Sequence, residues 1–224
     1  MLKNNKGFSL LEILIALALG AIMYGLFTAS GKDTRKVLDE AADNIEKAVI
    51  FSQDEASLRN SIVRLHFIFD KEPQEYGVEA GPDDSFILPS ISPTEGDSLE
   101  DREKLKKQIE QTNNKFKLVS EFDEKNKELN EQVTVVGLGS SQQEKLITNA
   151  QGSIYFYPSG EKDNAIIILG TQDELLALIV DSFSLDVKRI YRPLEGKEKN
   201  KKEELSNLQA EGAKELFDEW LKEK

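Results

Sequence analysis

A long apolar run, from Phe8 to Ala29, contains a single acidic residue, Glu12. A helix needs about 20 apolar residues to cross a bilayer, so the run predicts a transmembrane helix over residues 8–30. Two lysines precede the run, and this basic flank predicts a cytoplasmic N-terminus with the rest of the chain exported. A carboxylate inside such a helix costs about 2.5–3.5 kcal/mol on insertion scales, so we expect Glu12 to have a partner and a function.

Helical spacing of apolar residues resumes between Thr34 and Leu58. Because no proline interrupts residues 8–72, the sequence predicts one stem helix that continues through residues 31–60, outside the membrane. A glycine costs a helix about 1 kcal/mol, so we expect weak points at the glycines of the stem. These are Gly20, Gly25 and Gly31.

Strict alternation replaces the helical spacing over Ser61–Phe69 and predicts a strand. His66 shares a face of this strand with Arg64, so we expect a half-exposed residue rather than a ligand or a base. The other predicted strands are Lys115–Phe122, Gln132–Leu138, Ser153–Tyr157 and Ala165–Leu169, with two more in Leu175–Ile190. The stem and these strands predict an α+β fold, with the helix packed on antiparallel sheet over a β-rich domain at residues 61–193.

Charged residues interrupt this domain over an insertion at about residues 90–151. Within it, Ser98–Asn113 predicts a short exposed helix, because Ser98 is suited to cap it and acidic residues follow. We interpret the insertion as a solvated surface addition, and the alternative is a face specific for a partner.

The C-terminal part, residues 194–224, begins with a stretch rich in lysine and glutamate that we interpret as a linker. The segment Glu203–Lys224 then has the spacing of an amphipathic helix. Two interpretations remain open for its apolar face. Either it packs on the chain's own sheet, or Phe217, Trp220 and Leu221 contact another subunit.

Composition limits the chemistry of the chain. Its 224 residues suit one stem and one domain, and the net charge of -12 argues against binding nucleic acid. There is no cysteine and one histidine, which excludes thiolate catalysis, cysteine metal sites and multi-histidine sites. Gly137–Ser140 and Gly81–Asp84 are interpreted as turns rather than as a phosphate loop and a calcium site. We therefore expect no enzymatic activity, no cofactor and no metal.

The hexapeptide Gly7-Phe8-Ser9-Leu10-Leu11-Glu12 resembles the processing site of type IV prepilins and type II secretion pseudopilins. The resemblance implies that residues 1–7 are a leader, that a prepilin peptidase cleaves between Gly7 and Phe8, and that Phe8 becomes N-methylated. It also implies that Glu12 pairs with the Phe8 ammonium of a neighbouring subunit during assembly. The alternatives are a plain signal anchor and a secretory signal cleaved after Ala29.

Other segments resemble the H-type minor pseudopilins, the GspH/FimT-like proteins. Phe51–Phe67 resembles the end of their stem helix and first strand, Ser153–Leu169 a later hairpin, and Leu175–Ile190, more loosely, the last two strands. This resemblance implies a minor pseudopilin at or near the tip of a periplasmic filament that supports protein export. It implies a single-pass protein of the bacterial inner membrane with a periplasmic C-terminal domain. Its partners would be other major and minor pseudopilins, the prepilin peptidase and the inner-membrane secretion platform. The alternatives are a minor pilin of a type IV pilus, in adhesion, motility or DNA uptake, and a membrane-anchored periplasmic enzyme.

Overall fold

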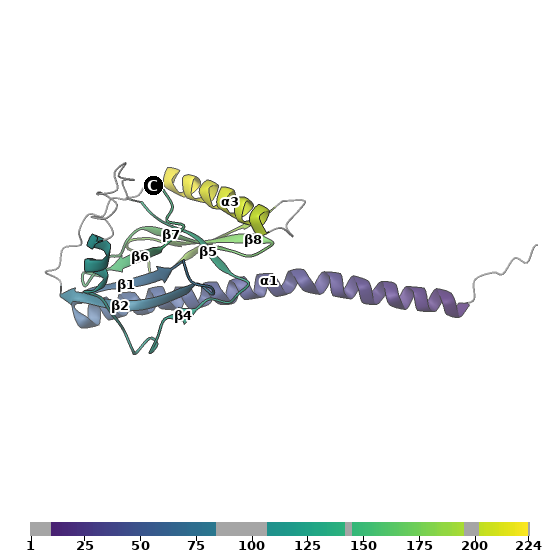
Figure 1. Cartoon of the computed structure of the whole chain (residues 1–224), viewed down its shortest axis with the longest axis horizontal. Coiled ribbons are helices and arrows are strands. Elements are labelled where there is room, and N and C mark those ends of the chain that lie inside the picture. The colour runs from purple at the N-terminus through teal and green to yellow at the C-terminus, as the bar shows by residue number, and fades with distance from the viewer. Residues whose placement is uncertain (1–9, 84–106, 142–144, 195–201, 224) are drawn as a thin grey trace, which may run out of the picture.

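The protein has an α+β fold that consists of a long N-terminal helix, two antiparallel sheets and a C-terminal helix (Figure 1). This computed structural model describes residues 10–83, 107–141, 145–194 and 202–223, and the side chains at 24–33, 83 and 202 are outside the description. The helices are α1 (Leu10–Arg59) and α3 (Lys202–Lys222). The strands are β1 (Ser61–Ile68), β2 (Glu75–Asp83), β3 (Lys117–Leu118), β4 (Lys127–Glu128), β5 (Thr134–Ser140), β6 (Gln151–Phe156), β7 (Ala165–Gly170), β8 (Glu174–Val180) and β9 (Lys188–Pro193). We call the two sheets together with α3 the head.

Helix α1 is continuous over 50 residues, as the proline-free sequence predicts. Its backbone stays helical through Gly20 and the two glycines after it, so the expected weak points do not break it. At 1.5 Å per residue the helix is about 75 Å long. It ends at Arg59. The next residue, Asn60, has a φ of 50°, the left-handed conformation that commonly closes a helix, and β1 follows directly.

The strands form two antiparallel sheets. The first has the order β3-β2-β1-β6, with β4 also paired to β2, and the second has the order β5-β7-β8-β9. The strand predicted at Ser61–Phe69 is confirmed as β1, and the run Leu175–Ile190 contains β8 and the start of β9. The two predicted turns are wrong. Gly137–Ser140 lies within β5, and residues 81–83 are the end of β2.

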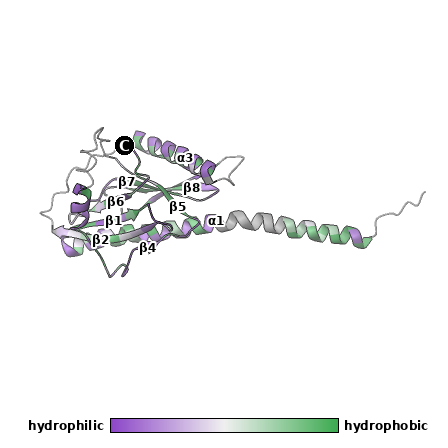
Figure 2. Ribbon diagram, viewed as in Figure 1, coloured by the Kyte–Doolittle hydropathy of each residue, from purple (hydrophilic) through white to green (hydrophobic). Residues whose placement is uncertain are grey.

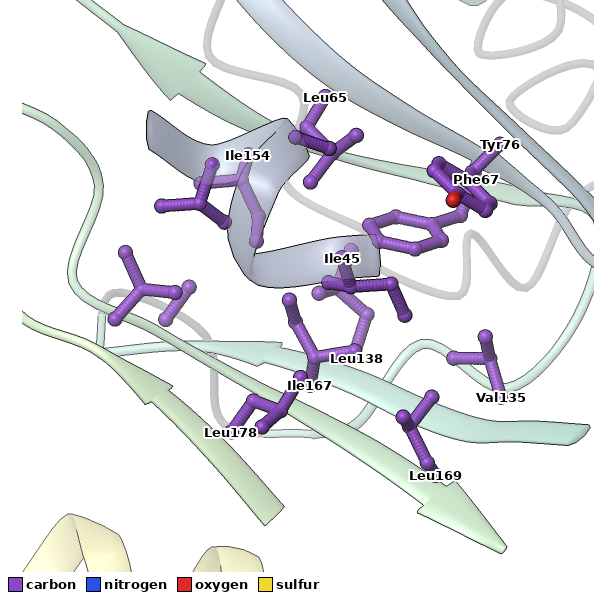
Figure 3. Packing of buried hydrophobic residues seen from close by; sticks show 14 of the residues in the cluster. Ile45, Leu65, Phe67, Tyr76, Val135, Leu138, Ile154, Ile167, Leu169 and Leu178 are labelled. Atoms are coloured by element: carbon purple, nitrogen blue, oxygen red, sulfur yellow. The ribbon is translucent and has the colours of Figure 1, made fainter. Parts of the chain in front are cut away.

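The main core lies between the two sheets, and the second half of α1 fills it. Ile45 of α1 points between Leu65 and Phe67 of the first sheet and Leu138 and Ile167 of the second (Figure 3). All five side chains are at most 2% exposed. Burying one such side chain contributes about 1.5–3 kcal/mol, so this helix face accounts for much of the stability of the head.

The second sheet is covered on both faces. Along β7, Ile167 faces α1 while Ile166 and Ile168 belong to a separate cluster with α3. Phe217 and Trp220 of α3 are only 2% and 3% exposed in that cluster, and Leu221 packs against it. The suggestion that these three residues contact another subunit is therefore corrected: their apolar surface is used by the chain's own sheet.

The charged insertion is also structural where it is described. Residues 107–113 are helical, as expected, but Phe116, Val119, Leu129 and Val133 are each no more than 7% exposed. The insertion also supplies β5. The interpretation as a solvated addition is thus wrong for these residues, because apolar positions spaced among the charges enter the core.

The outer face of the first sheet is buried beneath the insertion. Arg64 is 2% exposed; its Nε donates to Glu79 Oε2 at 2.7 Å, its Nη1 donates to Asn113 Oδ1 at 2.7 Å, and its guanidinium lies over the Phe116 ring. His66 is 6% exposed, and its Nδ1 lies 2.8 Å from Ser153 Oγ. The half-exposed position expected for His66 is wrong, since residues distant in sequence cover this face. Burial, and then the charge of Arg64, lower the pKa of His66 to about 4.

A polar seam joins α1 to the edge strand β9. Arg189 Nε donates to Glu46 Oε1 and Arg189 Nη2 donates to Asp43 Oδ1, both at 2.6 Å. The Tyr191 hydroxyl donates to Asp39 Oδ1 at 2.7 Å. These contacts are spaced along one side of α1, so they set its rotation about its own axis relative to the head.

Gly139→Ala should lower the free energy of unfolding by about 1–3 kcal/mol, the usual cost of overpacking a core. A Cβ at this position would lie closer to a ring carbon of Phe217 than van der Waals contact allows, so α3 would have to shift. The measurement is urea unfolding of the full chain in detergent. Gly20→Ala is the matched control, because nothing lies within 4 Å of its added Cβ. Equal stability of the two variants would contradict the close packing of α3 on β5.

Acidification should destabilise the protein partly through His66. Its folded pKa of about 4 lies below the ordinary 6.5, so the unfolded state binds more protons between these values. The stability contributed by the neutral ring is complete above pH 6.5 and is lost as the pH falls to 4, by roughly 3 kcal/mol. Urea unfolding of wild type and His66→Gln at pH 7 and pH 4 isolates this effect from other titrations. A pH dependence identical in both proteins would show that His66 is not the cause.

Candidate functional site

The functional candidate is the part of α1 that extends beyond the head (Figure 1). Nine large apolar side chains between Leu10 and Met23 are each more than half exposed. Their positions cover every side of the helix, and Figure 2 shows this end of α1 as predominantly hydrophobic. A helix that is apolar all round is normally buried in a membrane or among other helices, so this segment requires an apolar environment that the head does not supply.

Glu12 is the only ionisable residue among residues 10–23. It lies in the first turn of α1 and is exposed. Gly7 and Phe8 lie outside the described residues, so the structure does not place them relative to Glu12.

The head holds α1 from residue 34 onward. Thr34 Oγ1 donates to Asp173 Oδ2 at 3.0 Å, and Arg35 forms an ion pair with Glu174 at the start of β8. Arg35 also lies over the Tyr191 ring, 3.6 Å from its centroid. The polar contacts of Thr34 and Arg35 thus lie at the margin of the head, between the apolar end of α1 and its buried half.

Among the residues described, no helix is both long and apolar enough to cross a membrane.

The described part of the head offers little for catalysis. It contains no group of three or more histidine or acidic side chains arranged to hold a metal ion. The nearest approach to a nucleophile and base is Ser153 with His66. His66 is buried and Ser153 is half-buried in the first sheet, and burial, followed by the charge of Arg64, lowers the pKa of the imidazole. We assign the pair to packing.

Sequence reasoning identified Glu12 and the apolar stem, and the structure brings them together on one exposed helix end. It missed two exposed apolar side chains in the β8–β9 loop, Phe183 and Leu185, at 77% and 76% exposure. The sequence contains a pattern that could have revealed these exposed residues. Two apolar residues alternate there with serine and aspartate in a segment too polar to be a central strand.

Comparison with known protein families matches the N-terminal end of the chain. The family described as the prokaryotic N-terminal methylation motif matches residues 2–23, which include Glu12 and the whole exposed apolar segment Leu10–Met23. No curated protein and no solved structure matches the chain. The motif is that of membrane-anchored, processed proteins, and it indicates a type IV pilin-like protein, a class that covers both pilins and pseudopilins.

Proposed function

We propose that this chain is a minor pseudopilin of a type II secretion system, of the H type (GspH/FimT-like), and a structural subunit at or near the tip of the periplasmic pseudopilus. The observation that carries the proposal is a single helix with two different halves. Residues 10–23 are apolar all round with one carboxylate, and the second half of the helix is buried in an α+β head. Such a helix suits a subunit that is stored in a membrane and then packed among similar helices.

In this proposal residues 8–30 lie in the bacterial inner membrane, with the N-terminus in the cytoplasm and the head in the periplasm. A prepilin peptidase removes residues 1–7 and the new amino group of Phe8 is methylated. The neighbouring subunits are other pseudopilins, and the inner-membrane secretion platform drives assembly. The role is structural rather than enzymatic.

Glu12 provides the assembly chemistry. In an apolar layer its carboxylate lacks hydration, and the ammonium group of Phe8 from an adjacent subunit supplies both a counter-charge and hydrogen-bond donors. Pairing one carboxylate with one ammonium also fixes the axial register between two otherwise featureless apolar helices, as buried polar groups do in coiled coils.

Processing is tested by mass spectrometry of the mature protein from its native membrane. We expect an N-terminus at Phe8 with one added methyl group and no residue before it. Gly7→Val is the control and should keep the leader, because a β-branched side chain replaces the glycine at the cleavage site. An intact Met1 or an N-terminus after Ala29 would contradict the proposal.

Glu12→Ala should preserve membrane insertion and impair association with the other pseudopilins. Insertion becomes easier by about 2.5–3.5 kcal/mol. Association loses one member of a buried pair, which typically costs about 3–5 kcal/mol and corresponds to at least a hundredfold weaker binding. Co-purification with partner subunits and a blot of the membrane fraction measure the two effects. Glu40→Ala, an exposed acidic position on the same helix, is the control and should associate normally.

The secretion and pilus assignments predict different losses. Deleting the chain should abolish export of secreted proteins if the proposal holds. Loss of surface pili with normal export would instead indicate a minor pilin of a type IV pilus, since both classes share the N-terminal motif.

A further inference from the structure

The head carries a small apolar surface next to α1. Phe183 and Leu185 protrude from the β8–β9 loop at 77% and 76% exposure, and Ile50 of α1 is 51% exposed. We call these three residues the docking patch. Large apolar side chains exposed together on a soluble surface usually mark an interaction site.

The loop that presents the patch is held in place by the head. Buried Lys162 donates from Nζ to the Ser184 carbonyl at 2.7 Å and from its backbone N–H to the Ser182 carbonyl at 3.3 Å. Within the loop, Asp181 Oδ1 accepts from the Phe183 N–H and Ser184 Oγ accepts from the Asp186 N–H. A loop already fixed in one conformation loses little entropy on binding, which favours a contact function.

The same contacts place the loop on the flank of α1. Lys162 Nζ also donates to Gln53 Oε1 at 3.4 Å, and Ile50 lies about one turn before Gln53. Strand β9 then runs antiparallel along α1 from this level toward the stem, since Arg189 contacts Asp43 and Tyr191 contacts Asp39. The patch therefore lies at the end of the head far from the exposed stem.

Among the described residues, the exposed apolar segment of the stem and the docking patch therefore lie at different heights along α1. The midpoint of the exposed segment Leu10–Met23 and Ile50 are separated by about 50 Å along α1, at 1.5 Å per residue. Because the two surfaces differ, a contact between them joins unlike faces of successive subunits. Such heterologous contacts produce open chains when the rotation does not close.

We propose that the docking patch binds the apolar stem helix of an adjacent pilin-like subunit, displaced by about 50 Å along the filament axis. The stem offers a surface without charge apart from Glu12. A lipid surface is the competing occupant, but Asp181 and Asp186 flank the patch and would be repelled by anionic head groups. The inference rests on the proposed function, since it supposes neighbours with stems of this kind.

The test places photoreactive benzoylphenylalanine at Leu185 in the full chain, expressed in its native cells, followed by irradiation and peptide mapping. We expect the crosslinked peptide to be the N-terminal apolar segment of a pilin-like subunit. The same substitution at Lys214, exposed on α3 across the second sheet from α1, is the control and should not capture a stem. Crosslinks from Leu185 to lipid or to a head peptide would overturn the proposal, as would equal capture from Lys214.

A second measurement separates this inference from the proposed function. The double variant Phe183→Ser, Leu185→Ser should associate with partner subunits at least tenfold more weakly while its Tm remains unchanged, because both side chains are exposed. Unchanged association with correct processing at Phe8 would overturn the docking patch and leave the pseudopilin assignment standing. Absence of processing would instead remove the assignment.

Discussion

One helix must be buried between two sheets along its second half and remain outside the head along its first half. This constraint explains the composition of the buried face of α1. Four of its positions, Ala41, Ala42, Ala48 and Ala56, are alanines at most 6% exposed, and they let both sheets approach the helix backbone. Larger side chains at Ile45 and Val49 then fill the space between the sheets. The head exists only around this helix, so the stem cannot be separated from the fold.

Polar contacts determine how the helix is oriented. Packing of apolar side chains alone tolerates small rotations, whereas the Arg189 pairs with Asp43 and Glu46 and the Tyr191 hydroxyl on Asp39 have directional geometry. The backbone of α1 is helical without interruption from these residues back to Leu10. The seam in the head therefore fixes the direction in which Glu12 points relative to the docking patch. Because the helix is continuous, the hydrogen bonds of the seam determine the orientation of Glu12, which lies some 45 Å away along α1.

The sequence was most informative where a single periodic pattern covers a whole element. The proline-free helix, the alternating strand at Ser61 and the aliphatic strand at Ala165 were all predictable, because local pattern and burial agree there. His66 was misjudged because its face is covered by a segment that lies some 50 residues later in the chain. Local alternation reports which side chains share a face, but it does not reveal what covers that face. The α+β class follows from the pattern, while the two-sheet arrangement depends on long-range pairing.

The glycines of β5 also show that a local pattern does not reveal which distant segment packs against a residue. A run of glycine and serine favours a turn on local propensity, yet Gly139 is needed because Phe217 of α3 contacts the strand backbone there. For the same reason the aromatic residues of α3 are not free to bind a partner. Their place is taken by Phe183 and Leu185, on the side of the second sheet toward α1. The protein thus buries the apolar face of α3 against its own sheet and exposes a smaller apolar surface on the β8–β9 loop. That division suits the filament subunit proposed above. A small patch gains a useful contact only when the stem of a neighbour is already aligned beside it.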